Sequence, residues 1–239
     1  MKKAIVIGAS SGIGWELAKT LAKNHYEVGL MARRTHLLHD LQKEIITKTH
    51  IGYIDLSIPS EALEKATQMI HTMGGNDLFI INSGTGFINP ELDWNKEEQT
   101  IDVNVSGFTA LAGLAINYFL NQGHGHLVGI SSMGALRGNH QAPAYNASKA
   151  YMSNYLEGLR KKAFVDGKDI IVTDIKPGFV DTDMARGEGK FWVAEPSTAA
   201  EQIYAAINQK KSHAYVTKRW KLIGWLLKAM PFALYKRTM

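Results

Sequence analysis

A glycine-rich turn near the start of the chain separates a short apolar run from a helical pattern. Residues 8–14 read GASSGIG, residues 4–7 are apolar, and residues 13–24 carry apolar side chains at helical spacing. Glycines permit a tight turn and a close backbone approach, and a helix N-terminus offers free N–H groups to an anion. The segment therefore predicts a strand, a phosphate-binding turn and a helix.

Strand-like and helical segments alternate along the 239 residues. Apolar runs predict strands at 3–8, 27–31, 50–54, 78–82, 126–131, 170–175 and 214–216, with helices between them. This alternation implies a parallel sheet with helices on both faces and ligands at the carboxyl ends of its strands. We predict a single-domain, Rossmann-type, doubly wound α/β fold of about seven strands over residues 1–239.

The spacing of a tyrosine and a lysine predicts a proton donor. Tyr145 and Lys149 lie four residues apart, so on a helix they share one face. A nearby ammonium group stabilises phenolate, and we expect it to lower the pKa of Tyr145 from the usual value of about 10. A general acid works best when its pKa lies near the working pH.

Together these features resemble the short-chain dehydrogenase/reductase family over nearly the whole chain. The family's Gly-x-x-x-Gly-x-Gly pattern falls on residues 8–14, with a spacing unlike the commoner dinucleotide fingerprint. Its catalytic serine matches Ser132, with Ser131 as the alternative, and its catalytic asparagine matches Asn104 in an Asn-x-x-Gly segment. The resemblance thus implies a catalytic set of Asn104, Ser132, Tyr145 and Lys149.

The resemblance implies an oxidoreductase acting on CH–OH donors, with reversible hydride transfer between nicotinamide and a carbonyl or alcohol carbon. Tyr145 would donate the proton, and Ser132 would position the carbonyl oxygen. Lys149 would bind the nicotinamide ribose, and Asn104 would hold a water that relays protons to Lys149. A non-catalytic, NADP-binding regulatory protein of the same fold is the alternative.

The residues after the second predicted strand bear on the cofactor. NAD-preferring relatives often carry an acidic residue at the position of Ala32, whereas this chain continues with Arg33 and Arg34. We therefore predict NADP, with Arg33 as the main contact to the 2′-phosphate and NAD left open. The resemblance implies a cofactor site made of Gly8, Ser10, Ser11, Gly12, Ile13, Gly14, Arg33, Arg34, Asp55, Leu56, Asn82, Ser83, Gly84, Asn104, Tyr145, Lys149, Pro177, Gly178, Val180 and Thr182.

The chain departs from the family at two touching positions. Ile7 stands where relatives have a threonine that braces the glycine turn, and Ser83 stands where they have alanine. One hypothesis is that the Ser83 hydroxyl supplies the lost hydrogen bond. The alternative is that serine is simply small enough for the turn.

Residues 179–196 form a long segment between the sixth strand and the next helix, and long segments of this kind are often functional lids. Its aromatic residues, with Gly178, Gly187 and Gly189 as hinges, predict an apolar cover and a hydrophobic carbonyl substrate. His140 either lines the pocket or is an ordinary loop histidine. The candidate substrate residues are Ser132, Met133, Phe87, His140, Phe179, Phe191 and Trp192.

The carboxyl end carries the chain's positive charge. Residues 202–239 hold eight Lys/Arg and no Asp/Glu, which leaves 19 basic and 22 acidic residues in the remainder. Within the basic segment 218–239, Leu222, Ile223, Leu226, Leu227 and Met230 form a helical apolar stripe, with Lys218, Lys221, Trp225 and Lys228 on the other side. We expect the stripe to pack on the body or across a subunit interface. The alternative is an anionic membrane surface, which would suit a peripheral reductase of lipid-derived carbonyls.

Composition excludes several other classes. The absence of cysteine excludes disulfides, thiolate catalysis and cysteine-based metal sites, and the nine histidines form no HExxH motif, so we expect no metal. No nucleic-acid reader motif accompanies the basic residues. No run reaches the ~18 apolar residues of a membrane span, and we expect a cytoplasmic protein. Small side chains in the predicted helix 105–120 match the family's dimer interface, which implies a homodimer or homotetramer.

Overall fold

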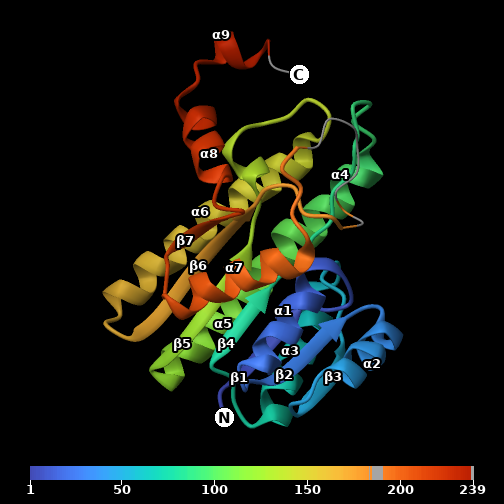
Figure 1. Cartoon of the computed structure of the whole chain (residues 1–239), viewed down its shortest axis with the longest axis vertical. Helices are drawn as coiled ribbons and strands as arrows, with labels where there is room; N and C mark the ends of the chain where they lie inside the picture. The colour runs from blue at the N-terminus through green and yellow to red at the C-terminus, as the bar shows by residue number, and fades with distance from the viewer. Residues whose placement is uncertain (183, 185–190, 238–239) are drawn as a thin grey trace.

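A seven-stranded parallel sheet forms the centre of the computed structural model, which describes residues 1–182, 184 and 191–237 (Figure 1). The strand order is β3-β2-β1-β4-β5-β6-β7. The strands are β1 (Lys3–Ile7), β2 (Glu27–Ala32), β3 (Thr49–Tyr53), β4 (Leu78–Ile81), β5 (His124–Ile130), β6 (Asp169–Pro177) and β7 (His213–Val216). The predicted fold class is confirmed, and each strand begins and ends within two residues of its predicted bounds.

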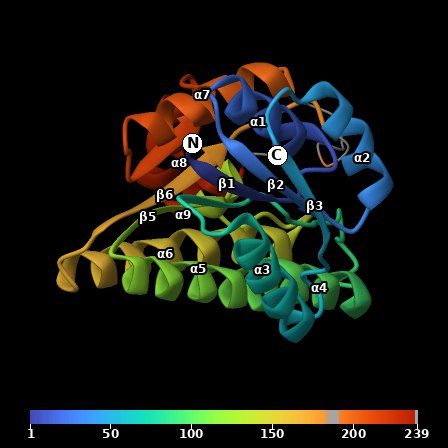
Figure 2. The ribbon, with the colours of Figure 1, turned by 90° about the horizontal axis from the view of Figure 1, so that it is seen from below.

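Helices cover both faces of the sheet (Figure 2). One layer holds α1 (Gly12–Lys23), α2 (Thr35–Glu44) and α7 (Pro196–Asn208), and the other holds α3 (Pro59–Met73), α5 (Phe108–Gln122) and α6 (Pro143–Val165). Alternation along β1 feeds two cores: Ala4 and Val6 pack with α1 and α7, while Ile5 and Ile7 pack with α3 and α5. Both faces of the strand are apolar, as buried parallel strands require.

A continuous helical stretch leads into α5. It starts as α4 (Trp94–Ile101), passes through a π-helical turn, η1 (Asp102–Gly107), and continues as α5. Among the described residues, this stretch of 94–122 is the one long and apolar enough to cross a membrane. Phe108, Leu111 and Phe119 are fully buried in the sheet-facing core, so it is a core helix.

The sheet changes its winding direction beside β1, which pairs with β2 on one side and β4 on the other. Ligands of open α/β sheets bind at such a switch point, outside the carboxyl ends of the strands. The segments that leave β1, β4 and β5 all emerge there, including the short helix η2 (Met133–Leu136) after β5.

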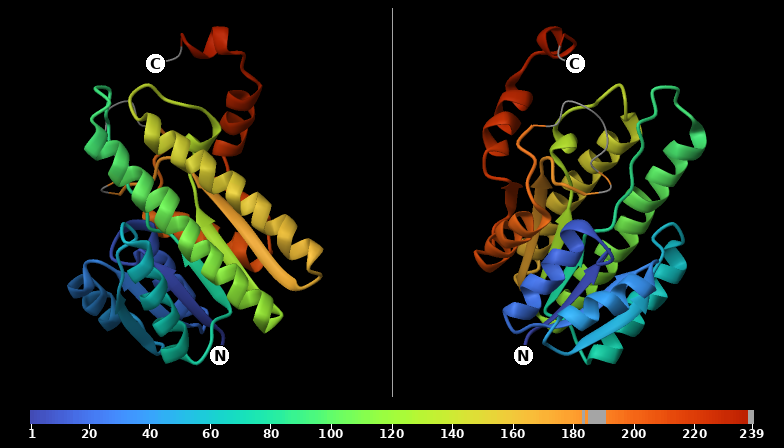
Figure 3. Two further views of the ribbon diagram at one scale, coloured as in Figure 1. Left: turned by 180° about the vertical axis from the view of Figure 1, so that it is seen from behind. Right: turned by 45° about the vertical axis from the view of Figure 1, so that its right-hand side comes forward.

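The C-terminal segment extends past the carboxyl edge of the sheet as α8 (Trp220–Ala229) and α9 (Phe232–Tyr235) (Figures 1 and 3). The predicted apolar stripe packs on the body only in part. Ile223 and Leu227 are half-buried, but Leu222 is 69% and Leu226 48% exposed. The reason is Gly224, whose missing side chain lets α8 approach Tyr215 and so turns Leu222 and Leu226 outward.

Candidate active site

The glycine turn joins β1 to α1 by a route that only small residues permit. Gly8 and Gly12 have positive φ angles of 89° and 56°. A Cβ on Gly14 would overlap the Gly8 carbonyl oxygen, and one on Gly8 would lie 2.7 Å from the Ser83 nitrogen. Ser11 precedes α1 without a side-chain capping bond, so the first N–H groups of the helix remain available to an anion.

Two arginines follow β2 and turn in different directions. The Arg34 guanidinium donates to the hydroxyls of Ser10 at 3.2 Å and Ser11 at 2.8 Å. Arg33 lies 3.9 Å from the Asp55 carboxylate, and its side chain is 66% exposed. Arg34 therefore crosses the glycine turn, whereas Arg33 stands at its rim.

The turn after β4 braces the glycine turn. The Asn82 amide donates to the Gly8 carbonyl at 2.9 Å, and the backbone N–H groups of Asn82 and Ser83 both donate to the Ile7 carbonyl at 2.9 Å. Within the described residues the Ser83 hydroxyl makes no hydrogen bond, so the hypothesis that this hydroxyl replaces the missing threonine is wrong. The Asn82 side chain and two main-chain N–H groups hold the two turns together instead.

Tyr145 and Lys149 lie on the first turns of α6 and share one face, as their spacing predicts. The Lys149 ammonium lies 5.8 Å from the Tyr145 ring centroid and donates to the Ile130 carbonyl at 3.0 Å. Ser132 follows β5, hydrogen-bonds Tyr145 and accepts the Gly134 N–H at 3.0 Å. The alternative serine, Ser131, is buried and donates to Asp174 at 2.5 Å.

Asn104 lies in the π-helical turn, fully buried. Its side chain accepts from the Thr85 N–H at 2.9 Å and donates to the Thr85 carbonyl at 2.7 Å and to Ser148 at 3.0 Å. Such turns recur at functional sites because they redirect a side chain within a helix. Here the turn aims Asn104 at the segment after β4.

Two glycines form the wall between these side chains. A Cβ on Gly84 would lie 3.0 Å from the Lys149 ammonium and 3.2 Å from the Asn104 carbonyl oxygen. A Cβ on Gly86 would overlap the Tyr145 ring. Sequence reasoning missed Thr85, Gly86 and Ser148, because a hydroxyl or glycine carries no signal until the partner across the fold is known.

The electrostatics of the pair differ from the prediction. Burial raises the pKa of Tyr145, and its hydrogen bond with Ser132 offsets that only in part. Burial also lowers the pKa of Lys149 to about 8, against the opposing charge of Asp174. The expected lowering of the Tyr145 pKa by Lys149 is therefore wrong for the protein alone: desolvation outweighs an ammonium that faces the Ile130 carbonyl.

The remaining predicted cofactor residues lie on segments at the same edge of the sheet. Asp55 follows β3 and accepts from the Ser57 N–H at 3.0 Å, and Leu56 is buried against Gly107. Pro177 ends β6, Val180 bridges to Ala194, and Thr182 lies against Gly12. The site residues as a set stay predictions, but the structure brings these segments to one edge of the sheet.

The predicted substrate residues fall into two groups. Phe179, Phe191 and Trp192 form an aromatic cluster with Trp220 of α8, with ring centroids 5.0–6.3 Å apart. Met133 is buried beside Gly224 of the same helix. The two ends of the 179–196 segment pair through Val180 and Ala194, while the predicted hinges Gly187 and Gly189 lie outside the described residues.

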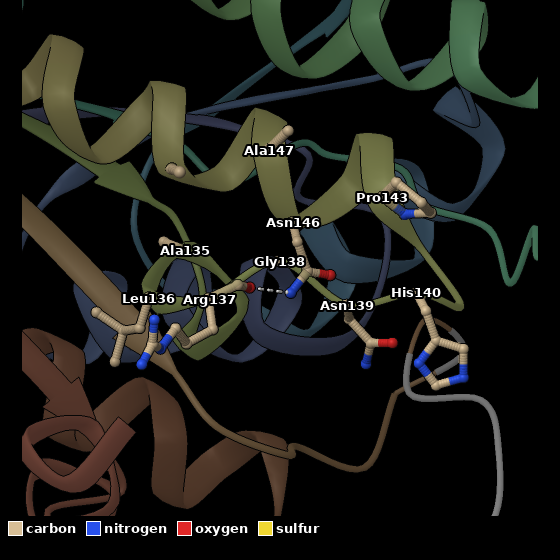
Figure 4. Close-up of a pocket in the computed structure, with 10 residues that line it drawn as sticks. Ala135, Leu136, Arg137, Gly138, Asn139, His140, Pro143, Asn146 and Ala147 are labelled. Carbon is tan, nitrogen blue, oxygen red and sulfur yellow. Dashed lines mark hydrogen bonds between the residues drawn. The ribbon is translucent and has the colours of Figure 1, made fainter. Parts of the chain in front are cut away.

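Phe87 and His140 lie apart from that cluster. Phe87 is half-buried on the segment after β4. His140 is exposed and lines a recess of about 480 Å³ between the 135–140 loop and the start of α6 (Figure 4). Asn146, which donates to the Arg137 carbonyl at 2.7 Å, lines it too, whereas Ser132 and Tyr145 do not. This placement favours an ordinary loop histidine.

Among the described residues, no group of three or more His, Cys, Asp or Glu side chains could hold a metal ion. The groups around the glycine turn suit a nucleotide better. The glycines let the turn pack closely against Ser83 and Thr182, α1 offers unused N–H groups, and Arg34 supplies positive charge beside them.

Comparison with known proteins agrees with this geometry. The short chain dehydrogenase family model matches residues 2–191. An uncharacterized oxidoreductase of Myxococcus xanthus is 34% identical over 189 residues, which cover 77% of this chain and 74% of that protein. An uncharacterized oxidoreductase of Mycobacterium tuberculosis is 29% identical over 226 residues, covering 90% and 88%.

Solved structures share the fold at low identity. A short-chain dehydrogenase from Sphingobium yanoikuyae in complex with NADPH has a TM-score of 0.80 at 21% identity, covering 100% of this chain and 97% of that one. A 3-ketoacyl-(acyl-carrier-protein) reductase from Brucella melitensis, complexed with NADH, has a TM-score of 0.80 at 21% identity, covering 91% and 97%.

Proposed function

The chain belongs to the short-chain dehydrogenase/reductase family of NAD(P)-dependent oxidoreductases, and from that premise we propose that it is an NADP-dependent reductase of hydrophobic carbonyl compounds. The observation that carries the proposal is the arrangement at Tyr145. Its ring packs on Gly86, Ser132 hydrogen-bonds it, and Lys149 lies one helical turn away. A phenol held in this way can pass a proton to a bound carbonyl oxygen.

The bound nicotinamide cofactor would supply the hydride. The glycine turn and the N-terminus of α1 would hold its pyrophosphate, because close backbone approach and free N–H groups coincide there. Asp55 would lie beside the adenine. Segments 82–84 and 177–182 would border the nicotinamide half.

Preference for NADP rests on the two arginines after β2. We assign the main 2′-phosphate contact to Arg34, because its guanidinium already crosses the glycine turn at Ser10 and Ser11. Arg33, the residue favoured by the sequence pattern, lies against Asp55 and would add a weaker contact from the rim. The charge-assisted bonds that an arginine makes to phosphate favour the phosphorylated cofactor.

Proton delivery follows from burial. Tyr145 keeps its proton at neutral pH because burial raises its pKa, so it is available as a donor. Lys149, with a pKa of about 8, stays mostly charged at neutral pH and would bind the cofactor's ribose. Asn104, fixed by Thr85 and Ser148, would hold the water that resupplies the proton.

The substrate class rests on the aromatic cluster of Phe179, Phe191, Trp192 and Trp220, which offers apolar surface beside buried Met133.

The surface of α5 supports assembly into a homodimer or homotetramer. All fifteen residues of α5 are uncharged, and a Cβ on Gly113 would meet open space. We place the protein in the cytoplasm as one domain.

The test is oxidation of NADPH and of NADH against a panel of apolar aldehydes and ketones. The proposal expects turnover with NADPH and a weaker rate with NADH. Tight NADPH binding without turnover on any panel member would favour the second candidate, a cofactor-binding regulatory protein of the same fold. Faster turnover with NADH would overturn the assignment of NADP.

A further inference from the structure

Helix α8 is apolar on two opposite faces. Trp220 and Gly224 are buried against the body. On the outward face, Leu222 and Trp225 are each 69% exposed and Leu226 is 48% exposed. These three positions follow the i, i+3, i+4 spacing of a single helical face, where a helix covering a water-soluble protein would carry polar residues.

Positive charge borders this outward face. Lys218, Lys221 and Lys228 are all exposed and recur at helical spacing with Trp225. The segment 202–239 carries eight basic residues and no acidic one, whereas the rest of the chain has a charge of −3 (19 − 22). The outward face of α8 is therefore complementary to a binding partner that is both apolar and anionic.

The outward face is held in a fixed position. Arg137 donates to the carbonyls of Leu227, at 2.8 Å, and Met230 at the end of α8. Its guanidinium lies 5.0 Å from the Tyr235 ring centroid, and the Tyr235 hydroxyl donates to the Gly138 carbonyl at 2.6 Å. These contacts of Arg137 and Tyr235 attach α8 and α9 to the body. Helix α9 adds Phe232, which is 70% exposed, to the apolar surface.

A recess of about 520 Å³ opens on the same side. Three cations and three apolar side chains line it: Lys218, Arg219, Lys221, Trp192, Leu222 and Trp225. This mixture suits the anionic headgroup and upper acyl chain of a lipid, and tryptophan is enriched at the membrane–water interface.

We propose that α8 and α9 form a docking surface for anionic lipid bilayers. A second copy of the chain is the less suitable occupant, because a two-fold contact between these segments would bring two basic surfaces together, and segment 202–239 carries no acidic residue of its own to offset them. Trp192, which lines the recess, also belongs to the aromatic cluster, so docking brings one edge of that cluster to the lipid surface. The proposal stands independently of the oxidoreductase assignment.

Co-sedimentation of the full chain with vesicles tests the proposal. We expect binding to vesicles of phosphatidylglycerol and phosphatidylcholine, little binding to phosphatidylcholine alone, and weaker binding as salt rises. Replacing Lys218, Lys221 and Lys228 with glutamine should lower partitioning by roughly a hundredfold, at about 1 kcal/mol for each basic residue.

The apolar contribution is tested by Leu222→Ser combined with Trp225→Ser, which should abolish sedimentation. The matched control is Phe164→Ser, at an 86% exposed aromatic residue near the C-terminal end of α6, which should bind like wild type. Circular dichroism and the thermal melting temperature show whether each variant is folded. Failure of wild type to bind anionic vesicles, or equal binding by both serine variants, would overturn the proposal. A dimer that only the Leu222/Trp225 variant loses would identify a second copy as the occupant instead.

Discussion

At the scale of single residues, desolvation dominates the candidate active site. Tyr145 and Lys149 lie on adjacent turns of α6, yet the Lys149 ammonium donates to the Ile130 carbonyl. Burial disfavours the charged form of each group, so it raises the pKa of Tyr145 and lowers the pKa of Lys149. The protein alone therefore holds a neutral phenol beside a lysine that titrates near pH 8. A ligand that binds beside Tyr145 and Lys149 would therefore change the protonation of these two groups.

Arg34 is the residue-scale test of cofactor choice. Arg34→Ala should raise the dissociation constant for NADPH by about 10- to 100-fold, because charge-assisted hydrogen bonds contribute about 1.5–3 kcal/mol each. The affinity for NADH should change little, since that cofactor lacks the 2′-phosphate. Fluorescence titration of both cofactors measures this, with Arg33→Ala as the matched control and a smaller expected loss. Equal losses for NADPH and NADH would contradict the assignment.

At the scale of elements, hydrophobic periodicity predicts the strands and helices that burial specifies. It does not predict features that depend on contacts with a distant segment of the chain. The seven strands follow from apolar runs because both faces of the sheet are covered. The π-helical turn at Asn104 is invisible to helical periodicity, which predicts an ordinary helix from residue 105 and gives no sign of the turn over Asp102–Gly107. Likewise, the role of Gly86 is evident only when the segment after β4 lies beside Tyr145 of α6.

Strand β5 supplies an element-scale prediction of pH dependence. His126 lies 2.7 Å from the Thr173 hydroxyl on β6, and burial, with smaller effects of Lys210 and Lys2, lowers its pKa from 6.5 to about 4. As pH falls below 6.5, His126 binds a proton in the unfolded chain but stays neutral in the folded chain until the pH nears 4. Stability present above pH 6.5 is therefore lost towards pH 4, by up to roughly 3 kcal/mol.

His126→Gln removes that titration while keeping a hydrogen-bonding side chain. Its free energy of unfolding should fall less than that of wild type between pH 7 and pH 4, as measured by urea denaturation. The exposed His140→Gln serves as the control and should follow the wild-type curve. Parallel curves for wild type and His126→Gln would refute this account of β5.

At the scale of the whole molecule, two surfaces differ from an ordinary solvated exterior. The α5 face carries no charge, and the C-terminal segment carries basic and apolar side chains together. Composition predicts the charge of the tail, but the exposure of Leu222 and Trp225 depends on Gly224 setting how α8 meets the body. The assembly and the tail are therefore tested separately.

Gly113→Arg probes assembly without disturbing the monomer, because a side chain there enters open space. If α5 forms the subunit interface, light scattering should show an oligomer for wild type and a monomer for the variant. Gln68→Arg, which adds the same charge at an exposed position of α3, should leave the oligomer intact. An oligomer that tolerates Gly113→Arg would place the interface elsewhere.

The central claim is that Tyr145 delivers the proton in an NADPH-dependent reduction, and Tyr145→Phe tests it most directly. The change removes one hydroxyl from a ring that keeps its packing against Gly86. The measurement is kcat with the best panel substrate, alongside the dissociation constant for NADPH. We predict a loss of about 10²- to 10⁴-fold in kcat, the range for a general acid, with NADPH affinity nearly unchanged. A variant that turns over at the wild-type rate would contradict the account.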